Sequence, residues 1–138
     1  ILKPMDGVTP YRLEMQAKAE IEETTNLYDY WGDRLYHSVI DDSRTIINLA
    51  SKEYSKCIER YLSDKDNYIT IIFCELSGDK LVTKGTYAKM ARGEMVRFMA
   101  ENNIENPIDI QKFDRLGYTF RGNLSSETEY VFERKIIK

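Results

Sequence analysis

Three cations lie where a predicted strand passes through a glycine into a predicted helix. The stretch "KGTYAKMARGEMVRF", residues 84–98, places Lys84, Lys89 and Arg92 around the first turns of that helix. The positive end of a helix dipole disfavours cations by about 0.3–1 kcal/mol each, so their position needs a reason. One reason is a bound phosphate or carboxylate, held by the cations and by free backbone N–H groups. The other is neutralisation by buried carboxylates such as Glu14, and the sequence leaves both open.

Further polar residues occupy comparable junctions. Arg12 and Glu14 share one face of a predicted strand, Asn48 and Ser51 lie where a strand meets a helix, and Tyr87 lies in the opening helix. If these junctions open on one side of a sheet, they line a single cleft with anion donors and a general acid or base. The cleft would suit a phosphate ester or a nucleotide. In the alternative, Arg12 pairs with Glu14, and the side chains of Asn48 and Ser51 cap backbone groups.

These junctions define two sets of candidate site residues. For anion or DNA binding the candidates are Lys3, Arg12, Lys84, Lys89 and Arg92. For the remainder of the cleft the candidates are Glu14, Asn48, Ser51 and Tyr87.

The other reactive residue types give weaker signals. The single histidine, His37, lies on the polar side of its predicted helix, which argues against a histidine-built metal site. Cys57 has basic neighbours that favour a thiolate, but its apolar helix face favours packing in a core. The acidic run at residues 20–23 is typical of a solvated loop. Fingerprints of serine hydrolases, P-loops and dinucleotide sites are absent from the sequence, and we expect no metal site, no cofactor and no assigned catalytic residue.

The composition limits the partners. The chain has 138 residues and a formal net charge of −3, with acids and bases interspersed, so a polyanion would have to be met by a local patch. Two cysteines without a CxxC pair indicate a reducing compartment, and we expect a cytoplasmic protein. No apolar run approaches the length that crosses a bilayer, so we expect no membrane partner.

The elements that position these residues are predicted from hydrophobic periodicity. We expect an α+β domain over residues 1–138, with a mixed β-sheet that carries helices on its faces. The predicted strands are "YRLEM", "TIINLA", "YITIIFCEL", "KLVTKGT", "YTF" and "EYVFERK". The predicted helices run from Asn26 to about Val39, from Ser51 to about Leu62, from about Tyr87 to Asn102, and from Asn106 with Pro107 to Gly117.

Ordered blocks of sequence resemble the YaaA family of bacterial peroxide-stress proteins. The blocks are "ILKPMDGVTPYRLEM", "NLYDYWGDRL", "IINLASKEY", "TYAKMARGEMVRFM" and "LGYTF" with "LSSETEYVFERK", in the family's order and over essentially the whole chain. Family members carry a further N-terminal portion of comparable size, so the chain resembles a C-terminal fragment of a family-specific fold. The apolar strands then leave surface that invites a homodimer.

The resemblance implies a function and its partner. It implies a cytoplasmic protein of the oxidative-stress response that binds DNA through a positively charged cleft and limits DNA damage and free iron. The helix-hairpin-helix element of the family is expected in the missing portion, and Met90 replaces the second of two lysines that the family usually has. Two alternatives stay open. They are an enzyme acting on a phosphorylated or nucleotide substrate in the same cleft, and a non-catalytic protein that handles iron or binds a partner.

Overall fold

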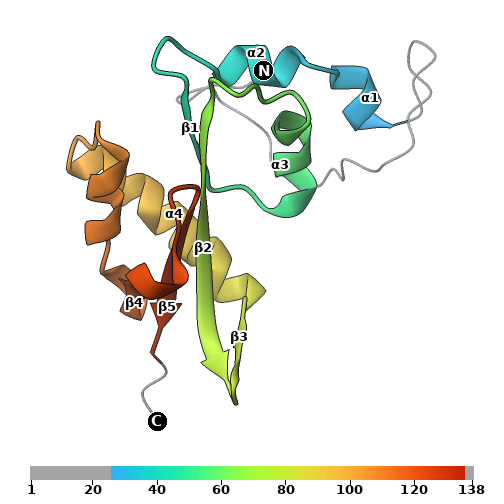
Figure 1. The fold of residues 1–138 in the computed structure, drawn as a ribbon. Coiled ribbons are helices and arrows are strands. Elements are labelled where there is room, and N and C mark those ends of the chain that lie inside the picture. The colour runs from blue at the N-terminus through green and yellow to red at the C-terminus, as the bar shows by residue number, and fades with distance from the viewer. Residues whose placement is uncertain (1–25, 136–138) are drawn as a thin grey trace. The chain divides into compact units, whose positions relative to one another are not determined.

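The computed structural model describes residues 26–135. By their contacts these residues form two compact units, the first made of residues 26–46 and 50–66 and the second of residues 47–49 and 67–135. Figure 1 shows the elements of both units in chain order. The expectation of one domain over residues 1–138 stays a prediction.

The first unit contains three short helices, α1 (Leu27–Trp31), α2 (Arg34–Val39) and α3 (Lys52–Glu59). Asn26 caps α1 as predicted, because its side-chain oxygen accepts a hydrogen bond from the Asp29 N–H at 2.9 Å. The prediction of one helix as far as Val39 is wrong, since α1 ends at Gly32, whose φ of +50° suits a residue without Cβ. The hydrophobic spacing continues across this break and hides it. The α3 helix also ends earlier than predicted.

The core of the first unit is small and aromatic. Leu27 and Cys57 are buried, and four partly buried side chains pack against them, those of Tyr28, Trp31, Leu35 and Ile58. Burial raises the pKa of the Cys57 thiol, which keeps it protonated rather than poised as a thiolate. The structure therefore favours the packing interpretation of Cys57.

A polar network closes the same unit around Asp66. Its carboxylate accepts hydrogen bonds from the Tyr36 hydroxyl at 2.6 Å and from the Ser63 N–H at 2.9 Å. Arg44 adds an ion pair, with 2.6 Å between Nη2 and Oδ1 of Asp66. The Ser63 N–H, followed by the Tyr36 hydroxyl, lowers the pKa of Asp66, because both stabilise the charged form. The network joins the chain after α2 to the chain after α3.

The second unit is built on a mixed sheet. Its strands are β1 (Thr45–Asn48, of which the last two residues belong to this unit), β2 (Asn67–Ser77), β3 (Lys80–Val82), β4 (Tyr118–Phe120) and β5 (Glu129–Arg134). The order is β1-β2-β5-β4, with β3 pairing with β2. β5 runs parallel to β2, whereas β3 and β4 are antiparallel to their neighbours. The strands of the β2–β3 hairpin and of the final pair all overlap predicted strands.

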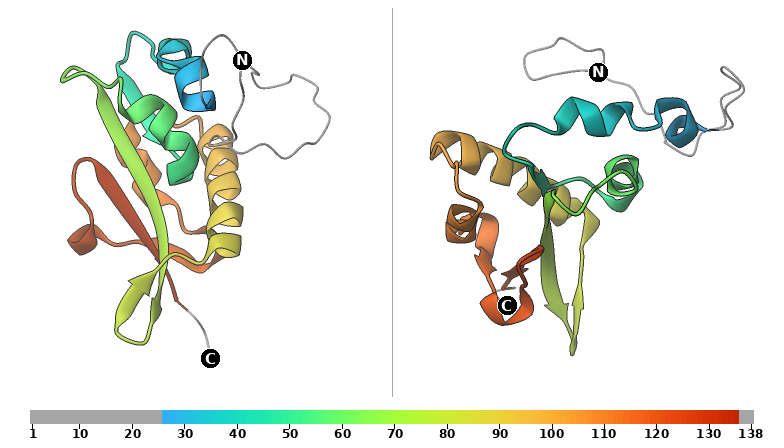
Figure 2. Two further views of the ribbon diagram at one scale, coloured as in Figure 1. Left: turned by 90° about the vertical axis from the view of Figure 1, so that its right-hand side faces the viewer. Right: turned by 45° about the horizontal axis from the view of Figure 1, so that its top comes forward.

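Helices cover one face of this sheet. The 17-residue α4 (Gly85–Glu101) and the 3₁₀ helix η1 (Pro107–Lys112) bury Ala91, Met95 and Ile110 against it, and Figure 2 shows α4 lying along β2. Two short 3₁₀ helices follow, η2 (Arg115–Gly117) and η3 (Gly122–Leu124). These layers confirm the α+β class.

Aromatic rings fill the space between α4, η1 and the sheet. Phe73 lies 5.0 Å from Tyr118, 5.5 Å from Phe132 and 5.8 Å from Phe113, measured between ring centroids. Edge and tilted contacts at such distances add to the stability that burial provides. The side chains of β2 alternate, so that Ile71, Phe73 and Glu75 project toward this core.

In the described part of the chain, none of the helices combines the length and the apolar character needed to cross a bilayer.

We predict that the Asp66 network stabilises the first unit in a pH-dependent way. Because folding lowers the pKa of Asp66, its contribution is present above the pKa of an unfolded aspartate, about 4, and is lost as the pH falls through the folded value. Asp66→Asn should lower the melting temperature at neutral pH, and the difference from wild type should shrink below about pH 4. Circular dichroism melts at several pH values measure this difference. Asp64→Asn, at an exposed neighbour, is the control, and a deficit that does not change with pH would contradict the prediction.

Candidate functional site

The start of α4 presents an uncapped helix end. Lys84 occupies the N-cap position, its side chain makes no capping hydrogen bond, and the first turn contains no acidic residue. Its backbone oxygen accepts the Ala88 N–H at 2.9 Å, so the helix begins in regular geometry. Lys84 therefore gives the first N–H groups of α4 no side-chain cap, and no other residue between 26 and 135 supplies one at this positive end of the dipole.

A buried glutamate lies beside this helix end. Glu75, near the end of β2, is only 3% exposed, and the parallel register places it opposite Arg134 of β5. One carboxylate oxygen lies 3.4 Å from Nη1 of Arg134 and the other 3.7 Å from Nζ of Lys84. Each oxygen thus faces one cation, and the three groups together keep one positive charge. Glu75 takes the neutralising role that the sequence had offered to other carboxylates.

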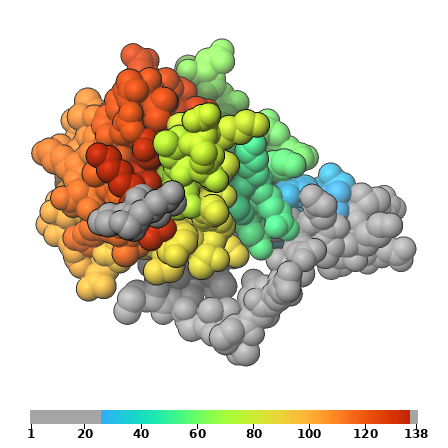
Figure 3. Space-filling view, turned by 90° about the horizontal axis from the view of Figure 1, so that it is seen from below, coloured from blue at the N-terminus to red at the C-terminus, as the bar shows by residue number. Residues whose placement is uncertain are grey.

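Tyr87 holds the same arginine from the opposite side. The guanidinium carbon of Arg134 lies 3.8 Å from the centre of the Tyr87 ring, which is a close cation–π contact. Tyr118 lies beneath, where burial raises the pKa of its hydroxyl and the charge of Arg134 acts against that rise. Figure 3 views this end of the unit, with the first turns of α4 in yellow beside the yellow-green β2–β3 hairpin.

One flank of α4 is neutralised by its own ion pairs. Arg97 binds Glu101 at 2.7 Å, one helical turn further along, a spacing that favours ion pairs. Arg115 contacts Glu94 at 2.9 Å and Glu101 at 2.6 Å, so Glu94 pairs with Arg115 instead of with Arg97. Hydrogen bonds from Arg97 and then from Arg115 lower the pKa of Glu101. This flank offers no uncompensated charge.

The other flank carries Lys89 and Arg92 without such partners. Helical spacing puts both on the side of α4 away from Glu94 and Glu101. Lys89 is exposed and Arg92 half-buried, and neither forms an ion pair with another residue of the described range 26–135. Gly93 follows them, and a Cβ there would meet nothing within 4 Å. As far as residues 26–135 are concerned, the flank is therefore accessible to an anionic partner.

The remaining candidates are placed less directly. Asn48 is buried in the second unit, where its amide donates to the Thr70 hydroxyl at 3.3 Å. Ser51 belongs to the first unit and precedes α3 without a side-chain capping bond. Lys3, Arg12 and Glu14 lie outside the described residues. The single cleft that would join these groups stays a prediction.

Two residues of the cluster were missed, although the sequence carries a signal for each. Glu75 continues the alternation of Ile71 and Phe73, which makes it a charge at a core-facing position. Arg134 continues the alternation of Tyr130 and Phe132 in the same way. Two opposite charges at core-facing positions of two strands indicate a buried cross-strand pair. To predict this charge pair from the sequence, one would also have had to know that β2 pairs with β5.

A pocket of about 530 Å³ lies at the other end of the same strands. Asn67 and Ile69 of β2 and Tyr130 of β5 contribute to its lining, together with residues of η1 and of the loop after β4. The lining contains no lysine or arginine. β2 is 11 residues long, so the pocket and the Glu75 cluster are separated by about 20–30 Å along the strand.

Metal ligands do not gather in the described residues. Within the range 26–135, no three histidine, cysteine, aspartate or glutamate side chains lie together in a way that could hold a metal ion. His37 is exposed and contacts Asp33, 3.1 Å away.

Comparison with known proteins gives consistent matches. Residues 1–124 match the family model described as peroxide stress protein YaaA. A UPF0246 protein of Agathobacter rectalis is 79% identical over 136 residues, which cover 99% of this chain and 55% of the relative. UPF0246 proteins of Lachnoclostridium phytofermentans and Desulfitobacterium hafniense are 54% and 53% identical over 132 residues, 96% of this chain and 52% and 53% of theirs. The chain spans about half the length of the curated relatives it matches.

We predict that Glu75 stabilises the second unit through its two cations. Glu75→Gln should lower the free energy of unfolding by about 1–3 kcal/mol, because it leaves the partly buried Arg134 without its counter-charge. Urea denaturation measures this loss. Glu129→Gln, at an exposed position of β5, should change it by less than about 0.5 kcal/mol. Equal effects of the two substitutions would contradict the structural role of Glu75.

Proposed function

The chain belongs to the peroxide stress protein YaaA family, and on this premise we propose that it binds DNA through the phosphates and so limits oxidative DNA damage. Membership confirms the resemblance that the sequence blocks indicated. The family supports a role in the response to peroxide. The mode of DNA binding and its effect on damage are the proposal.

The observation that carries the proposal is the open flank of α4. Lys89 and Arg92 point from the first turns of a helix and form no ion pair within the described range, while Arg97 on the opposite flank is fully paired. A protein that needed these charges only for folding would be expected to pair them. Arginine binds phosphate oxygens in a two-pronged geometry and lysine binds them as a point charge.

The neighbouring cluster supports the same partner. Lys84 and Arg134 share the single negative charge of Glu75, which leaves a net positive charge beside the uncapped start of α4. Backbone N–H groups at such a helix end bind phosphate readily. The candidate contacts are all of the positioning kind and carry little information on base sequence. Binding should therefore be nearly independent of sequence.

Phosphate contacts also suggest how DNA would be protected. Ferrous iron is a cation, and cations condense around DNA because of its phosphate charge. A protein that neutralises phosphates displaces these counterions, and with them iron that could react with peroxide at the backbone. The described residues include no cluster of metal ligands, so we assign the proposed limitation of free iron no binding site in residues 26–135.

The alternative of an enzyme for a phosphorylated or nucleotide substrate would be favoured by a narrow pocket on which cations converge. The pocket of about 530 Å³ contains no lysine or arginine in its lining. It also lies at the opposite end of β2 from Glu75 and its two cations. These observations favour the DNA proposal over the enzyme.

We further propose that the chain self-associates through exposed apolar side chains. Leu76 and Leu81 face each other across the β2–β3 hairpin and are 51% and 42% exposed. Pairing two such hairpins would remove both side chains from water. We predict a dimer by light scattering at high protein concentration and a monomer for Leu81→Lys. Monomeric wild-type protein would contradict this proposal.

We predict that Lys89 and Arg92 set the salt dependence of DNA binding. With about three phosphate contacts, the slope of log K against log salt should lie between about −2 and −4. Lys89→Ala with Arg92→Ala should flatten the slope by about two units and leave the melting temperature nearly unchanged. Fluorescence anisotropy of labelled duplex DNA between about 50 and 200 mM salt measures it.

The matched control removes the same two residue types from existing ion pairs. Arg97 and Lys112 contact Glu101 and Asp109, so changing both to alanine alters the net charge equally without touching the open flank. This control should keep the parental slope. A double variant of Lys89 and Arg92 with the parental slope would show that the flank is not the DNA site. One that unfolds would return both residues to a structural role.

A further inference from the structure

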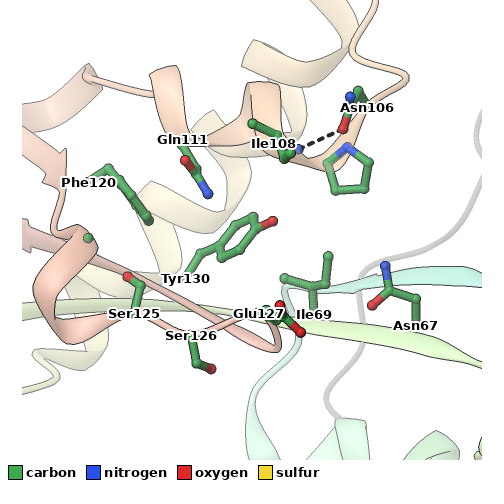
Figure 4. Close-up of a pocket in the computed structure, with 12 residues that line it drawn as sticks. Asn67, Ile69, Asn106, Ile108, Gln111, Phe120, Ser125, Ser126, Glu127 and Tyr130 are labelled. Atoms are coloured by element: carbon green, nitrogen blue, oxygen red, sulfur yellow. Dashed lines mark hydrogen bonds between the residues drawn. The ribbon is translucent and has the colours of Figure 1, made fainter.

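The pocket at the start of β2 and β5 contains an unused hydroxyl. Tyr130 as a whole is only 5% exposed, and its ring packs edge-on against Phe120 with centroids 5.9 Å apart. Figure 4 shows the ring rising into the middle of the pocket, with Gln111 and Ile108 on one side and Ser126 on the other. Among the residues that line the pocket, the one hydrogen bond drawn joins Asn106 to Ile108. The Tyr130 hydroxyl thus has no protein partner in the described chain.

The polar groups of the lining divide into occupied and available ones. Ser125 donates to the Arg121 carbonyl and accepts the Val131 N–H, and Ser126 accepts the N–H groups of two following residues, so both hydroxyls serve the loop. The Asn106 oxygen caps η1. The groups that remain available come from four different elements. They are the Tyr130 hydroxyl, the carboxamides of Gln111 and Asn67, and the carboxylate of Glu127.

These available groups specify the charge of a ligand. The Tyr130 hydroxyl faces the pocket and forms no hydrogen bond with another described residue, so it is free to pair with a ligand that enters. The lining has no cation and one carboxylate, so the pocket disfavours phosphate and other anions. A ligand with several N–H donors, neutral or positive, would match the four available groups.

The shape and walls narrow the ligand class further. Ile69, Ile108 and Phe120 give the pocket apolar walls, and its volume of about 530 Å³ lies in the range of small-molecule sites. Carboxamides pair in a two-pronged way with the amide-like and amino edges of planar heterocycles, and carboxylates accept from exocyclic amino groups. Aromatic side chains pack against the rings of such heterocycles.

We propose that this pocket binds a nucleobase, with the Tyr130 hydroxyl and the Gln111 carboxamide pairing with the base edge and Glu127 accepting from an exocyclic amino group. The site is separate from the cationic flank of α4 and does not rest on phosphate binding there. The pocket would bind the base of a nucleotide, whereas the flank of α4 would bind its phosphate.

The first test uses guanosine and adenosine, measured by isothermal titration and saturation-transfer NMR with the protein. Tyr130→Phe keeps the packing on Phe120 and removes only the hydroxyl, so it should weaken nucleoside binding by about 2- to 12-fold. Gln111→Ala should weaken it similarly. Tyr87→Phe removes a tyrosine hydroxyl at the other end of the strands and should leave binding unchanged. Equal affinity of wild type and Tyr130→Phe would overturn the proposal.

The second test concerns the ligand class. Guanosine should bind about 3-fold or more tightly than inosine, which lacks the exocyclic amino group, and Glu127→Gln should reduce this preference. Inorganic phosphate should not compete. Competition by phosphate, or an equal response to the peptide-like amide N-acetylglycinamide, would overturn the assignment to a base. So would the absence of binding by any nucleoside at millimolar concentration.

A third comparison separates this site from the phosphate proposal. The double alanine variant of Lys89 and Arg92 should keep nucleoside binding while the salt slope of its DNA binding flattens by about two units. Tyr130→Phe should weaken nucleoside binding and keep the parental salt slope of DNA binding. If nucleoside binding disappeared with the two cations, the base would be held at α4 and the pocket assignment would be overturned.

Discussion

The parallel pairing of β2 with β5 is the constraint on which the second unit depends. It sets Ile71 beside Tyr130, Phe73 beside Phe132 and Glu75 beside Arg134. The first two pairs build the aromatic core under α4 and η1, and the third ends that core with a buried charge pair. A shift of one residue would turn every one of these side chains to the other face. The same register therefore fixes both the stability of the unit and the charge at its end.

The two ends of these strands differ in chemistry. At the carboxyl ends, Lys84 and Arg134 outnumber Glu75, and an uncapped helix start adds its dipole. At the amino ends, the pocket has apolar walls and several polar groups but no cation, and its Tyr130 hydroxyl forms no hydrogen bond with another described residue. We therefore propose phosphate as the ligand of one end and a base as the ligand of the other, at two separate sites.

Local sequence patterns predicted the helices, strands and turns better than they predicted which strands pair with each other. The alternation in "YITIIFCEL", the turn at Gly78 and the cap at Asn106 are local signals, and each corresponds to an observed feature. The cations Lys84, Lys89 and Arg92 were chosen as candidate anion ligands from helix position alone, and that role stays a prediction. Glu75, Arg134 and Tyr130 depend on which strands become neighbours, and spacing along one strand does not contain that information. The break at Gly32 was missed because the apolar spacing continues on both of its sides.

The β2–β5 ladder also has a consequence for synthesis on the ribosome. Glu75 and its partner Arg134 are 59 residues apart, so one edge of β2 stays unpaired until β5 has emerged. At ordinary translation rates this interval lasts about 3–12 s, much longer than a helix or hairpin needs to form. During that time a long apolar strand has an open edge, which is the usual route to misassembly between nascent chains. The interval between the synthesis of β2 and that of β5 is thus the stage at which the nascent chain is most open to chaperone binding and aggregation.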